Sequence, residues 1–365
     1  MTGNTLGWVI VAFVLYLLMM IAIGAFYAKG NNNSEDYFLG GRKLNGFVAA
    51  LSAQASDMSG WLLMGLPGAI YLTGVGGDGW IAIGLFIGTT LNWLFIATKL
   101  RRYTIRANNS VTLPTYFENR FHDDKKVLMT VSSITIVVFF LVYCASALSA
   151  GGQLFESVFG IDYHVALTIG ALVVLVYTFL GGFTAVCVTD FIQGMLMLVG
   201  ILAVPLFAYH FLTGNGTTLA AGLEASGADS ANFLNLMKNG DGSNNIISVI
   251  SGLGWGLGYF GMPHILVRFM AVRDEKEMTK SKATAISWVA LSLGFAVFIG
   301  ILGRAYLPEL VNGNNEKVFI EMIKKVFTVE MRAPFIAGLF LCGILAAIMS
   351  TADSQLLVSA SSVRS

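Results

Sequence analysis

The sequence predicts an all-α protein that crosses a membrane several times. Of its 365 residues, 56% are hydrophobic and 12% are charged, and the mean hydropathy is +0.73. Soluble domains carry about 25% charged residues, so this composition is typical of a polytopic membrane protein. A membrane-spanning helix needs about 20 apolar residues. Nine apolar runs approach or exceed that length, at residues 7–27, 47–72, 79–98, 127–156, 163–180, 187–212, 246–271, 284–307 and 333–362.

Composition and motifs argue against several function classes. The net charge is +1 and no basic stripe is present, so we expect no nucleic-acid partner. Neither GxSxG nor HExxH occurs, and the four histidines are scattered, so we expect no enzyme. Cys144, Cys187 and Cys342 lie in apolar runs at spacings that fit no zinc site, and we interpret them as small core residues.

The placement of Lys and Arg predicts the orientation. The run 7–27 is too long for the apolar core of a signal peptide, so we expect a retained helix. With the N-terminus outside, 16 of the 22 basic residues fall in cytoplasmic segments, among them 99–126 and 268–283. Positive residues gather on the cytoplasmic side. The segment 213–245 is then an outer loop, and 308–332 is expected to contain a short interfacial helix.

The run 47–72 has a carboxylate near its centre. Asp57 is flanked by Ser56 and Ser59, although an ionised Asp at the bilayer midplane costs about 2.5–3.5 kcal/mol. The residues that follow favour an interrupted helix, namely Gly60, Gly65, Pro67 and Gly68. Freed carbonyls at that depth must be buried or line a cavity. Hydroxyls, carbonyls and a carboxylate together suit a small cation; the alternative is a structural Asp bonded to neighbouring helices.

The run 246–271 is interrupted in a similar way, by the sequence GWGLGYFGMPH at 254–264. Two broken spans in corresponding places indicate an inverted-repeat transporter whose site lies at the bilayer midplane. The alternative is close helix packing, because glycines four residues apart let helices approach. The repeat hypothesis divides the chain into an N-terminal helix and loop at 1–46, a first five-helix repeat at 47–212, and a second repeat at 246–365.

The last run, 333–362, carries further oxygen ligands. Ala347, Ser350 and Thr351 stand at i, i+3 and i+4 on one helix face, where the small Ala347 leaves room for another backbone. The alternative is that both hydroxyls bond back to the preceding turn of their own helix. Asp353 is a second candidate for an acid inside the membrane, although we favour a position near the cytoplasmic end of the helix.

Three motifs together resemble the sodium/solute symporter family. They are Asp57-Met58-Ser59-Gly60-Trp61, Gly181-Gly182-Phe183-Thr184-Ala185 and Met349-Ser350-Thr351, and the loop 34–42 is also similar. The resemblance covers essentially the whole chain. It implies a LeuT-type fold of two inverted five-helix repeats and sodium-coupled import of a solute across a bacterial inner membrane, with Na⁺ as the coupling ion.

The resemblance also implies roles for individual residues. The sodium ligands would be backbone carbonyls of Ala55, Met58 and Ala347 and the hydroxyls of Ser350 and Thr351, with Asp57 as the acid required for sodium-coupled binding. The solute would be L-proline. Its pocket would comprise Ser59, Gly60, Tyr143, Trp255, Tyr259 and Pro263, with Trp255 and Tyr259 on one helix face. Arg42 and Asp190 would be polar positions important for transport.

Two alternatives to proline import stay open at this point. One is a symporter of the same fold for another small solute, such as pantothenate, a sugar or a carboxylate. The other is a symporter-like membrane domain of a sensor protein. Members of the family normally continue for several more spans. We therefore expect the chain ending at Ser365 to be truncated after about nine transmembrane helices and, expressed alone, not to accumulate solute.

Overall fold

The computed structural model describes residues 3–28, 33–312 and 314–364. The described chain is helical throughout, with two isolated β-bridges and no strand. Ser365 and residues 31–32 of the first loop lie outside the described residues. The main helices are α1 (Asn4–Tyr27), α2 (Ser34–Leu39), α3 (Gly46–Gly60), α4 (Leu66–Thr73), α5 (Val75–Leu91), α6 (Ala97–Arg106), α7 (Leu113–Phe121), α8 (Val127–Phe159), α9 (Tyr163–Gly214), α10 (Leu219–Ala225), α11 (Ser230–Phe233), α12 (Ile246–Gly254), α13 (Pro263–Ala271), α14 (Glu275–Tyr306), α15 (Val318–Ile323) and α16 (Pro334–Arg364).

Length and apolar character identify fewer continuous spans than the nine predicted. Six helices of the described chain pass this test, or seven if the bent pair Ile246–Gly261 and Pro263–Ala271 counts as one span. Two of the predicted spans, 163–180 and 187–212, follow one another in α9, which has 52 residues and is broken at Gly182, between them. Together they count once among the helices that pass the test. The predicted span 47–72 is divided between α3 and α4.

Three breaks interrupt the helices, and each has a local cause. In α9, Gly182 has φ 60° and ψ −162°, a conformation that is essentially restricted to glycine. Between α12 and α13, the chain passes through a 3-10 helix, η5 (Trp255–Gly261), and an extended Met262 before Pro263 restarts the helix. In α3 the break falls at Ser59, with φ 51° and ψ −174°. The predicted breakers Gly65 and Pro67 lie beyond it, in a π-helical turn and at the start of α4.

Gly252 and Gly256, four residues apart in α12 and η5, serve packing, as the alternative for this segment proposed, whereas a Cβ added to Gly254, Gly258 or Gly261 would meet no atom within 4 Å. A Cβ added to Gly256 would lie 2.2 Å from the Gly84 carbonyl oxygen, and one added to Gly88 would lie 2.2 Å from the Gly256 oxygen. These glycines therefore let α5 and the broken helix come into backbone contact. The break itself lies at Met262 and Pro263. The packing interpretation therefore holds for Gly256, and the broken-span interpretation holds for Met262 and Pro263.

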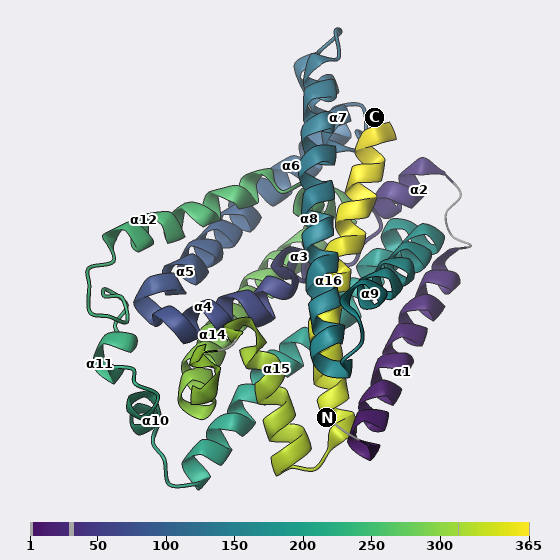
Figure 1. The fold of residues 1–365 in the computed structure, drawn as a ribbon. Coiled ribbons are helices and arrows are strands. Elements are labelled where there is room, and N and C mark those ends of the chain that lie inside the picture. Colours follow the sequence, from purple (N-terminus) through teal and green to yellow (C-terminus); the bar gives the residue numbers. More distant parts are fainter. Residues whose placement is uncertain (1–2, 29–32, 313, 365) are drawn as a thin grey trace.

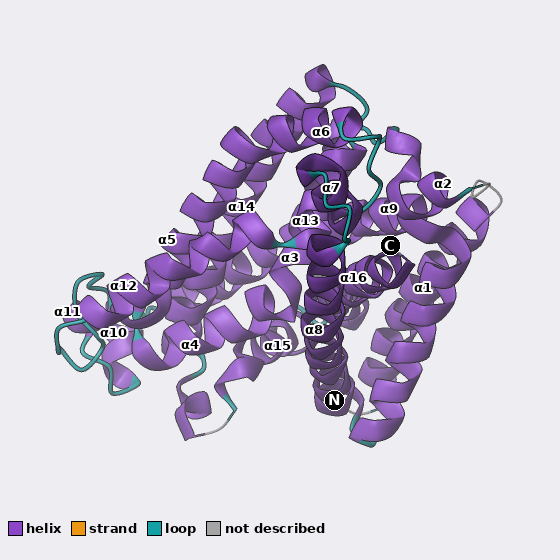
Figure 2. Cartoon of the chain, turned by 90° about the horizontal axis from the view of Figure 1, so that it is seen from above, coloured by secondary structure: helices purple, strands orange, loops and turns teal. Residues whose placement is uncertain are grey.

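Helix α16 is the central column of the molecule (Figure 1). It packs against α1, α3, α8 and α9, and 83% of its most apolar stretch is buried. Viewed from above, the other long helices lie around this column and α3 (Figure 2). The N-terminus and α15 lie at one end of the molecule, and α7 and the last residues of α16 lie at the other (Figure 1). Two functional helices, α3 and α16, thus meet in the interior.

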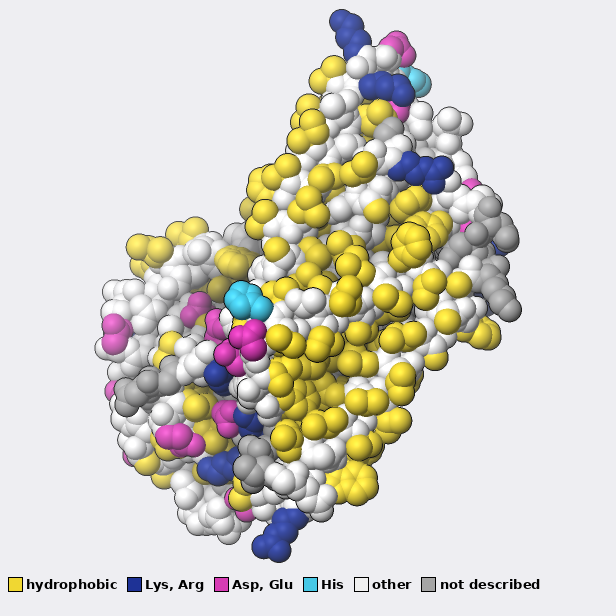
Figure 3. Space-filling model, turned by 45° about the vertical axis from the view of Figure 1, so that its right-hand side comes forward, with side chains coloured by type: hydrophobic (Ala, Val, Ile, Leu, Met, Phe, Trp, Pro, Cys, Tyr) yellow, Lys and Arg dark blue, Asp and Glu magenta, His cyan; other side chains and the backbone are white. Residues whose placement is uncertain are grey.

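The outer surface is suited to lipid. Phe139, Val142 and Phe179 expose 68%, 68% and 77% of their surface, respectively, from α8 and α9. Figure 3 shows apolar side chains over the centre and right of one face, with Lys and Arg at its upper and lower ends and a mixed group of charged side chains over the lower left. Exposed apolar side chains on long helices with charges at the two ends match the cross-section of a bilayer. The protein is therefore an all-α polytopic membrane protein.

The break in α9 gives a test of the fold. We expect Gly182→Ala to lower the melting temperature of the protein in detergent, because a side chain in this backbone conformation costs about 1–3 kcal/mol. Gly170→Ala is the matched control in the same helix, since an added Cβ there meets no atom within 4 Å. Alanine is the better helix former, so the control should keep or raise the melting temperature. Equal melting temperatures for the two variants would contradict the break.

Candidate functional site

The broken end of α3 supplies the backbone oxygens of the site. Its first half begins at Asn45, whose side chain caps the Phe47 N–H, and runs as a fully buried helix from Ala49 to Met58. At Ser59 the backbone leaves the helical region. The Ser59 hydroxyl then accepts a hydrogen bond from the Trp61 N–H at 3.1 Å, which fixes the direction in which the chain continues.

Two hydroxyls of α16 face the carbonyls of α3. Ser350 Oγ donates to the Ala55 oxygen at 2.9 Å, and Thr351 Oγ1 donates to the Ser56 oxygen at 3.0 Å. The same hydroxyls lie 3.3 and 3.0 Å from the Ala347 oxygen, so the bond back to their own helix is also present. Four of the predicted sodium residues, Ala55, Ala347, Ser350 and Thr351, are therefore together. Their oxygens are buried and uncharged, a donor set that fits a small hard cation.

Met58 and Asp57 occupy different places relative to this cluster. The Met58 carbonyl lies at the broken end of α3, where it accepts a hydrogen bond from the Trp61 N–H. Asp57 instead lines a small cavity beside Tyr143 and Tyr259, and no hydrogen bond joins it to α16 in the described chain. One carboxylate oxygen of Asp57 has no partner among the described residues, although it is buried. The structure thus places Asp57 on the cavity side of α3.

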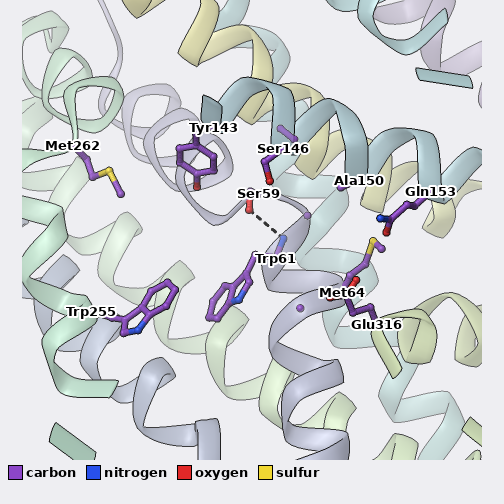
Figure 4. Close-up of a pocket in the computed structure, with 13 residues that line it drawn as sticks. Ser59, Trp61, Met64, Tyr143, Ser146, Ala150, Gln153, Trp255, Met262 and Glu316 are labelled. Carbon is purple, nitrogen blue, oxygen red and sulfur yellow. Dashed lines mark hydrogen bonds between the residues drawn. The ribbon is translucent and has the colours of Figure 1, made fainter. Parts of the chain in front are cut away.

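Two neighbouring cavities begin at the break. The outer one has a volume of about 520 Å³ and the inner one about 100 Å³. They share Ser59, Trp61, Tyr143, Trp255 and Met262, so together they form one stepped pocket. Figure 4 shows the side chains of the outer cavity converging from the two broken helices and α8. Asp57 and Tyr259 lie at the inner end, and Glu316 lies at the outer end.

The two broken helices meet through their aromatic side chains. The indoles of Trp61 and Trp255 are stacked, with ring centroids 6.0 Å apart and planes 16° from parallel. Tyr259 is buried, whereas Trp255 exposes 53% of its surface. The segment is a 3-10 helix, so the assumption that Trp255 and Tyr259 share the face of an α-helix at i and i+4 is wrong. Both nevertheless line the inner cavity, because the pocket curves around them.

The remaining predicted pocket residues divide into two groups. Ser59, Gly60 and Tyr143 line the outer cavity, and Gly60 leaves room for the side chain of Ile348, which lies 3.1 Å from where a Cβ would stand. Pro263 lines neither cavity and instead starts α13. Its neighbour Met262 lines both cavities instead. The sequence reasoning also missed part of the wall of the outer cavity, namely Trp61, Met64, Ser146, Gln153 and Glu316.

Arg42 lies outside the pocket, at the end of the molecule where α6 and α13 finish. Its guanidinium donates to the Met270 oxygen at 2.7 Å, to the Ser110 oxygen at 2.8 Å and to Asn109 Oδ1 at 3.0 Å. Burial is the largest influence on the Arg42 guanidinium and lowers its pKa to about 10, so it stays charged at neutral pH. Arg42 therefore joins the segment between α6 and α7 to the last turn of α13 rather than contacting the solute.

Asp190 is buried and forms an ion pair that the sequence reasoning missed. Its Oδ2 accepts a hydrogen bond from Arg268 at 3.0 Å, and neither side chain is exposed. Arg268 had been assigned to the cytoplasmic segment 268–283, because it follows an apolar run, but it lies inside the protein. The sequence did contain a signal for the burial of Arg268, because it is an ionisable residue beside a broken span. Asp353 is likewise fully buried, and its carboxylate accepts a hydrogen bond from the Tyr177 hydroxyl at 2.6 Å.

Two broken helices around a buried central site define the class of a secondary transporter. A model of the sodium:solute symporter family matches residues 37–365, and the chain belongs to this family. It is accordingly a transporter and not an enzyme.

Comparison with known proteins finds named relatives. The chain is 44% identical over 360 residues to the sodium/proline symporter of Escherichia coli (strain K12), covering 97% of this chain and 69% of that protein. It is 43% identical over 356 residues to the sodium/proline symporter of Staphylococcus aureus (strain COL), covering 97% of this chain and 67% of that protein.

A solved structure establishes the fold. A sodium-coupled sialic acid symporter, described in a substrate-bound outward-open state, superposes with a TM-score of 0.81 over 98% of this chain and 74% of its own. The sequence identity is 21%, so this comparison bears on the fold alone. It confirms the predicted LeuT-type fold.

The unusual backbone at Ser59 leads to a prediction. Its φ and ψ lie in a region that is essentially restricted to glycine and costs other residues about 1–3 kcal/mol. We expect Ser59→Gly to raise the melting temperature and to weaken solute binding, because strain and hydroxyl are both lost. Ser59→Ala should weaken binding without gaining stability. Melting temperature and solute affinity, measured on the same samples, separate these effects; a glycine variant no more stable than the alanine variant would show that Ser59 is unstrained.

Proposed function

We propose that the protein is a sodium-coupled symporter that imports L-proline by alternating access around a fixed central site. The observation that carries this proposal is the buried oxygen cluster of Ala55, Ala347, Ser350 and Thr351 directly behind an aromatic pocket. The sodium/proline symporters among its relatives supply the identity of the solute. The ion and solute sites share α3, so occupation of one changes the backbone that forms the other.

The sodium site in this proposal is built from oxygens on both sides of one helix contact. Carbonyls of Ala55, Met58 and Ala347 and hydroxyls of Ser350 and Thr351 would hold Na⁺. At present the two hydroxyls donate to carbonyls; a bound cation would take the oxygens of both partners. We assign Asp57 a role from the cavity side, where its charge attracts the cationic group of the solute and thereby strengthens sodium-coupled binding.

The pocket is chemically suited to a zwitterion with an apolar ring. Its lining contains the carboxylates of Asp57 and Glu316 and no Lys, Arg or His. The indoles of Trp61 and Trp255 and the ring of Tyr143 offer apolar faces that also attract a secondary ammonium. Ser59, Gly60 and Tyr259 complete the proposed contacts, with Pro263 shaping the wall through Met262. This charge pattern disfavours the anionic alternatives, pantothenate and other carboxylates.

The larger cavity favours one second candidate, a neutral sugar. Its volume of about 520 Å³ exceeds what a single amino acid requires, and Gln153 and Ser146 offer hydrogen bonds to hydroxyl groups. Uptake competition by a panel of unlabelled solutes, including proline, neutral sugars and pantothenate, would identify the preferred class.

The energetics of import follow from the membrane. An inside-negative potential contributes about 2.3 kcal/mol per charge per 100 mV for each Na⁺ that enters, in addition to the concentration gradient. Coupling requires that each ligand bind more tightly when the other is present, and this coupling is reciprocal. A site in which both ligands contact one broken helix meets that requirement.

We also propose a topology for the transporter, with the N-terminus outside a bacterial inner membrane. The distribution of Lys and Arg supports it. The outer cavity reaches Glu316, in the 3-10 turn directly before α15, and α15 lies on the side of the molecule that carries the N-terminus (Figure 1). In this orientation the pocket faces outward. The division into 1–46, 47–212 and 246–365, with a broken helix first in each repeat, and the transport roles of Arg42 and Asp190 belong to the same proposal.

Uptake of radiolabelled proline into vesicles tests the function directly. Vesicles containing the full-length protein should accumulate proline under an inward sodium gradient and not under a potassium gradient. Asp57→Asn should abolish sodium-driven uptake without changing membrane insertion. Asp57→Glu should retain weak activity, because the carboxylate is kept but lies on a longer side chain. Sodium-driven uptake at the wild-type rate in the Asn variant would refute the role of Asp57.

The two hydroxyls of α16 give a second prediction. Ser350→Ala or Thr351→Ala should raise the sodium concentration for half-maximal uptake by about tenfold, the equivalent of about 1.4 kcal/mol for one lost oxygen ligand. Proline binding at saturating sodium should change much less. Ser350→Thr and Thr351→Ser keep the oxygen and should be milder. If the alanine and hydroxyl variants had the same sodium dependence, the two residues would contribute packing only.

A further inference from the structure

A guanidinium in the interior joins four helices. Arg268, on α13, donates from Nε to Ser52 Oγ at 3.0 Å and from Nη2 to Ser56 Oγ at 3.1 Å, both on α3. Nη2 also donates to Asp190 Oδ2 on α9 at 3.0 Å and to Ser354 Oγ on α16. Nη1 donates to the His264 oxygen at 2.8 Å, within α13. All three guanidinium nitrogens are therefore bonded to oxygen.

This cluster is costly to bury and must have a compensating role. Arg268 and Asp190 are both 0% exposed, and a buried ion pair is often no more stable than an apolar replacement of the same volume. Ser52 and Ser56 also donate to Asp190 Oδ2, at 2.6 and 3.0 Å, so the carboxylate is held by three groups. The Phe183 ring lies 5.4 Å from the guanidinium carbon. Such a fully oriented pair fixes the relative position of the helices that it joins.

The cluster adjoins the oxygens assigned to sodium. Ser56 links the two: its hydroxyl accepts a bond from Arg268, and its carbonyl accepts the bond from the assigned hydroxyl of Thr351. Ser354 follows Ser350 and Thr351 by four and three residues, so it lies one turn along α16, and its hydroxyl lies 2.9 Å from Ser56 Oγ. Arg268 thus bonds to α3 at Ser56, one residue from Ala55. It bonds to α16 at Ser354, one helical turn from Ser350 and Thr351.

We propose that Arg268, with its charge balanced by Asp190, is a positioning residue for the sodium site. Its guanidinium sets the separation of α3 and α16, and that separation decides whether the Ala55 carbonyl and the hydroxyls of Ser350 and Thr351 converge on one ion. Arg268 does not touch the ion or the solute. It also couples the positions of the two broken helices, because Arg268 belongs to α13 and two of its partners, Ser52 and Ser56, belong to α3. The inference rests on the proposed sodium coupling.

The geometry requires arginine rather than any cation. Nε and Nη2 together reach oxygens on α3, α9 and α16 while Nη1 bonds within α13, whereas the ammonium of lysine is a single compact centre. Arg268→Lys should therefore keep the charge balance with Asp190 and lose part of the spacing. The sodium concentration for half-maximal uptake should rise about tenfold, the equivalent of one lost hydrogen bond to a charged group. Maximal rate and proline affinity at saturating sodium should stay within about twofold of wild type, a ratio worth less than 0.5 kcal/mol.

A charge-neutral double variant removes the risk of misfolding. Arg268→Gln alone leaves Asp190 buried and unpaired, which is strongly destabilising. Arg268→Gln combined with Asp190→Asn removes both charges of the ion pair; the buried Asp353 keeps its hydrogen bonds from Tyr177 and Ser354, so this variant should insert at wild-type levels. Its sodium requirement should rise at least as much as that of the Lys variant. A double variant with wild-type sodium dependence, or a Lys variant that loses only maximal rate, would overturn the positioning role.

The matched control is another arginine, Arg304, which is partly buried. Arg304, on α14, bonds to the Ser226 hydroxyl at 3.0 Å, on the segment that follows α10 and away from the sodium cluster. Arg304→Gln should lower the melting temperature without changing the sodium requirement. An equal shift in sodium requirement for the Arg304 and Arg268 variants would mean that general destabilisation, and not positioning, is being measured.

A binding measurement keeps this test separate from the proposed function. Sodium that binds the native state raises the melting temperature of the purified protein relative to potassium, without any solute. The shift should be present in wild type, reduced in the Arg268 variants and intact in Arg304→Gln. A wild-type protein that responds to sodium but does not take up proline would refute the solute and leave the role of Arg268 standing. An intact sodium shift in the Arg268 double variant would refute that role alone.

Discussion

The constraint on which the structure depends is that backbone groups inside a membrane must find partners in the protein. The break in α3 at Ser59 lies close to the carbonyls of Ala55, Ser56 and Met58. Hydroxyls of Ser350 and Thr351 donate to the first two, and the Trp61 N–H donates to the third. The buried helix α16 therefore supplies hydrogen-bond donors beside the broken part of α3. A hydroxyl that serves as a donor in this arrangement can serve as a ligand when a cation binds.

Much of this could be predicted from the sequence, because the relevant signals were local. Asp57 within an apolar run, the pair Ser350 and Thr351 after a small residue, and the Gly- and Pro-interrupted run 246–271 each violate the pattern of a simple span. These violations mark the residues that the structure brings to the interior. The family and the fold followed from the same motifs, and the comparisons confirm both.

The rest could not be predicted because it depends on pairing between distant segments. Arg268 looked like the first residue of a cytoplasmic loop, and only its partners on α3, α9 and α16 show that it is buried. Gly65 and Pro67 are stronger helix breakers than Ser59, yet the break falls at Ser59, where α16 and the Trp61 amide compensate it. Asp57 was grouped with sodium by its position in the sequence, while its side chain lies on the opposite, cavity side of the helix.

The two breaks also differ in how firmly their flanking segments are held, and this difference bears on alternating access. The first half of α3 is bonded to α16 through Ala55 and Ser56 and to α13 through Arg268, so it belongs to the same rigid unit as α13. Beyond Ser59, the chain is held mainly by the stacking of Trp61 on Trp255 and by the packing of α4 against α5 and α14. Aromatic stacking tolerates sliding more readily than an oriented network of charged hydrogen bonds. Movement that closes the outer cavity is therefore expected at Trp61 and Trp255, while the sodium oxygens keep their places.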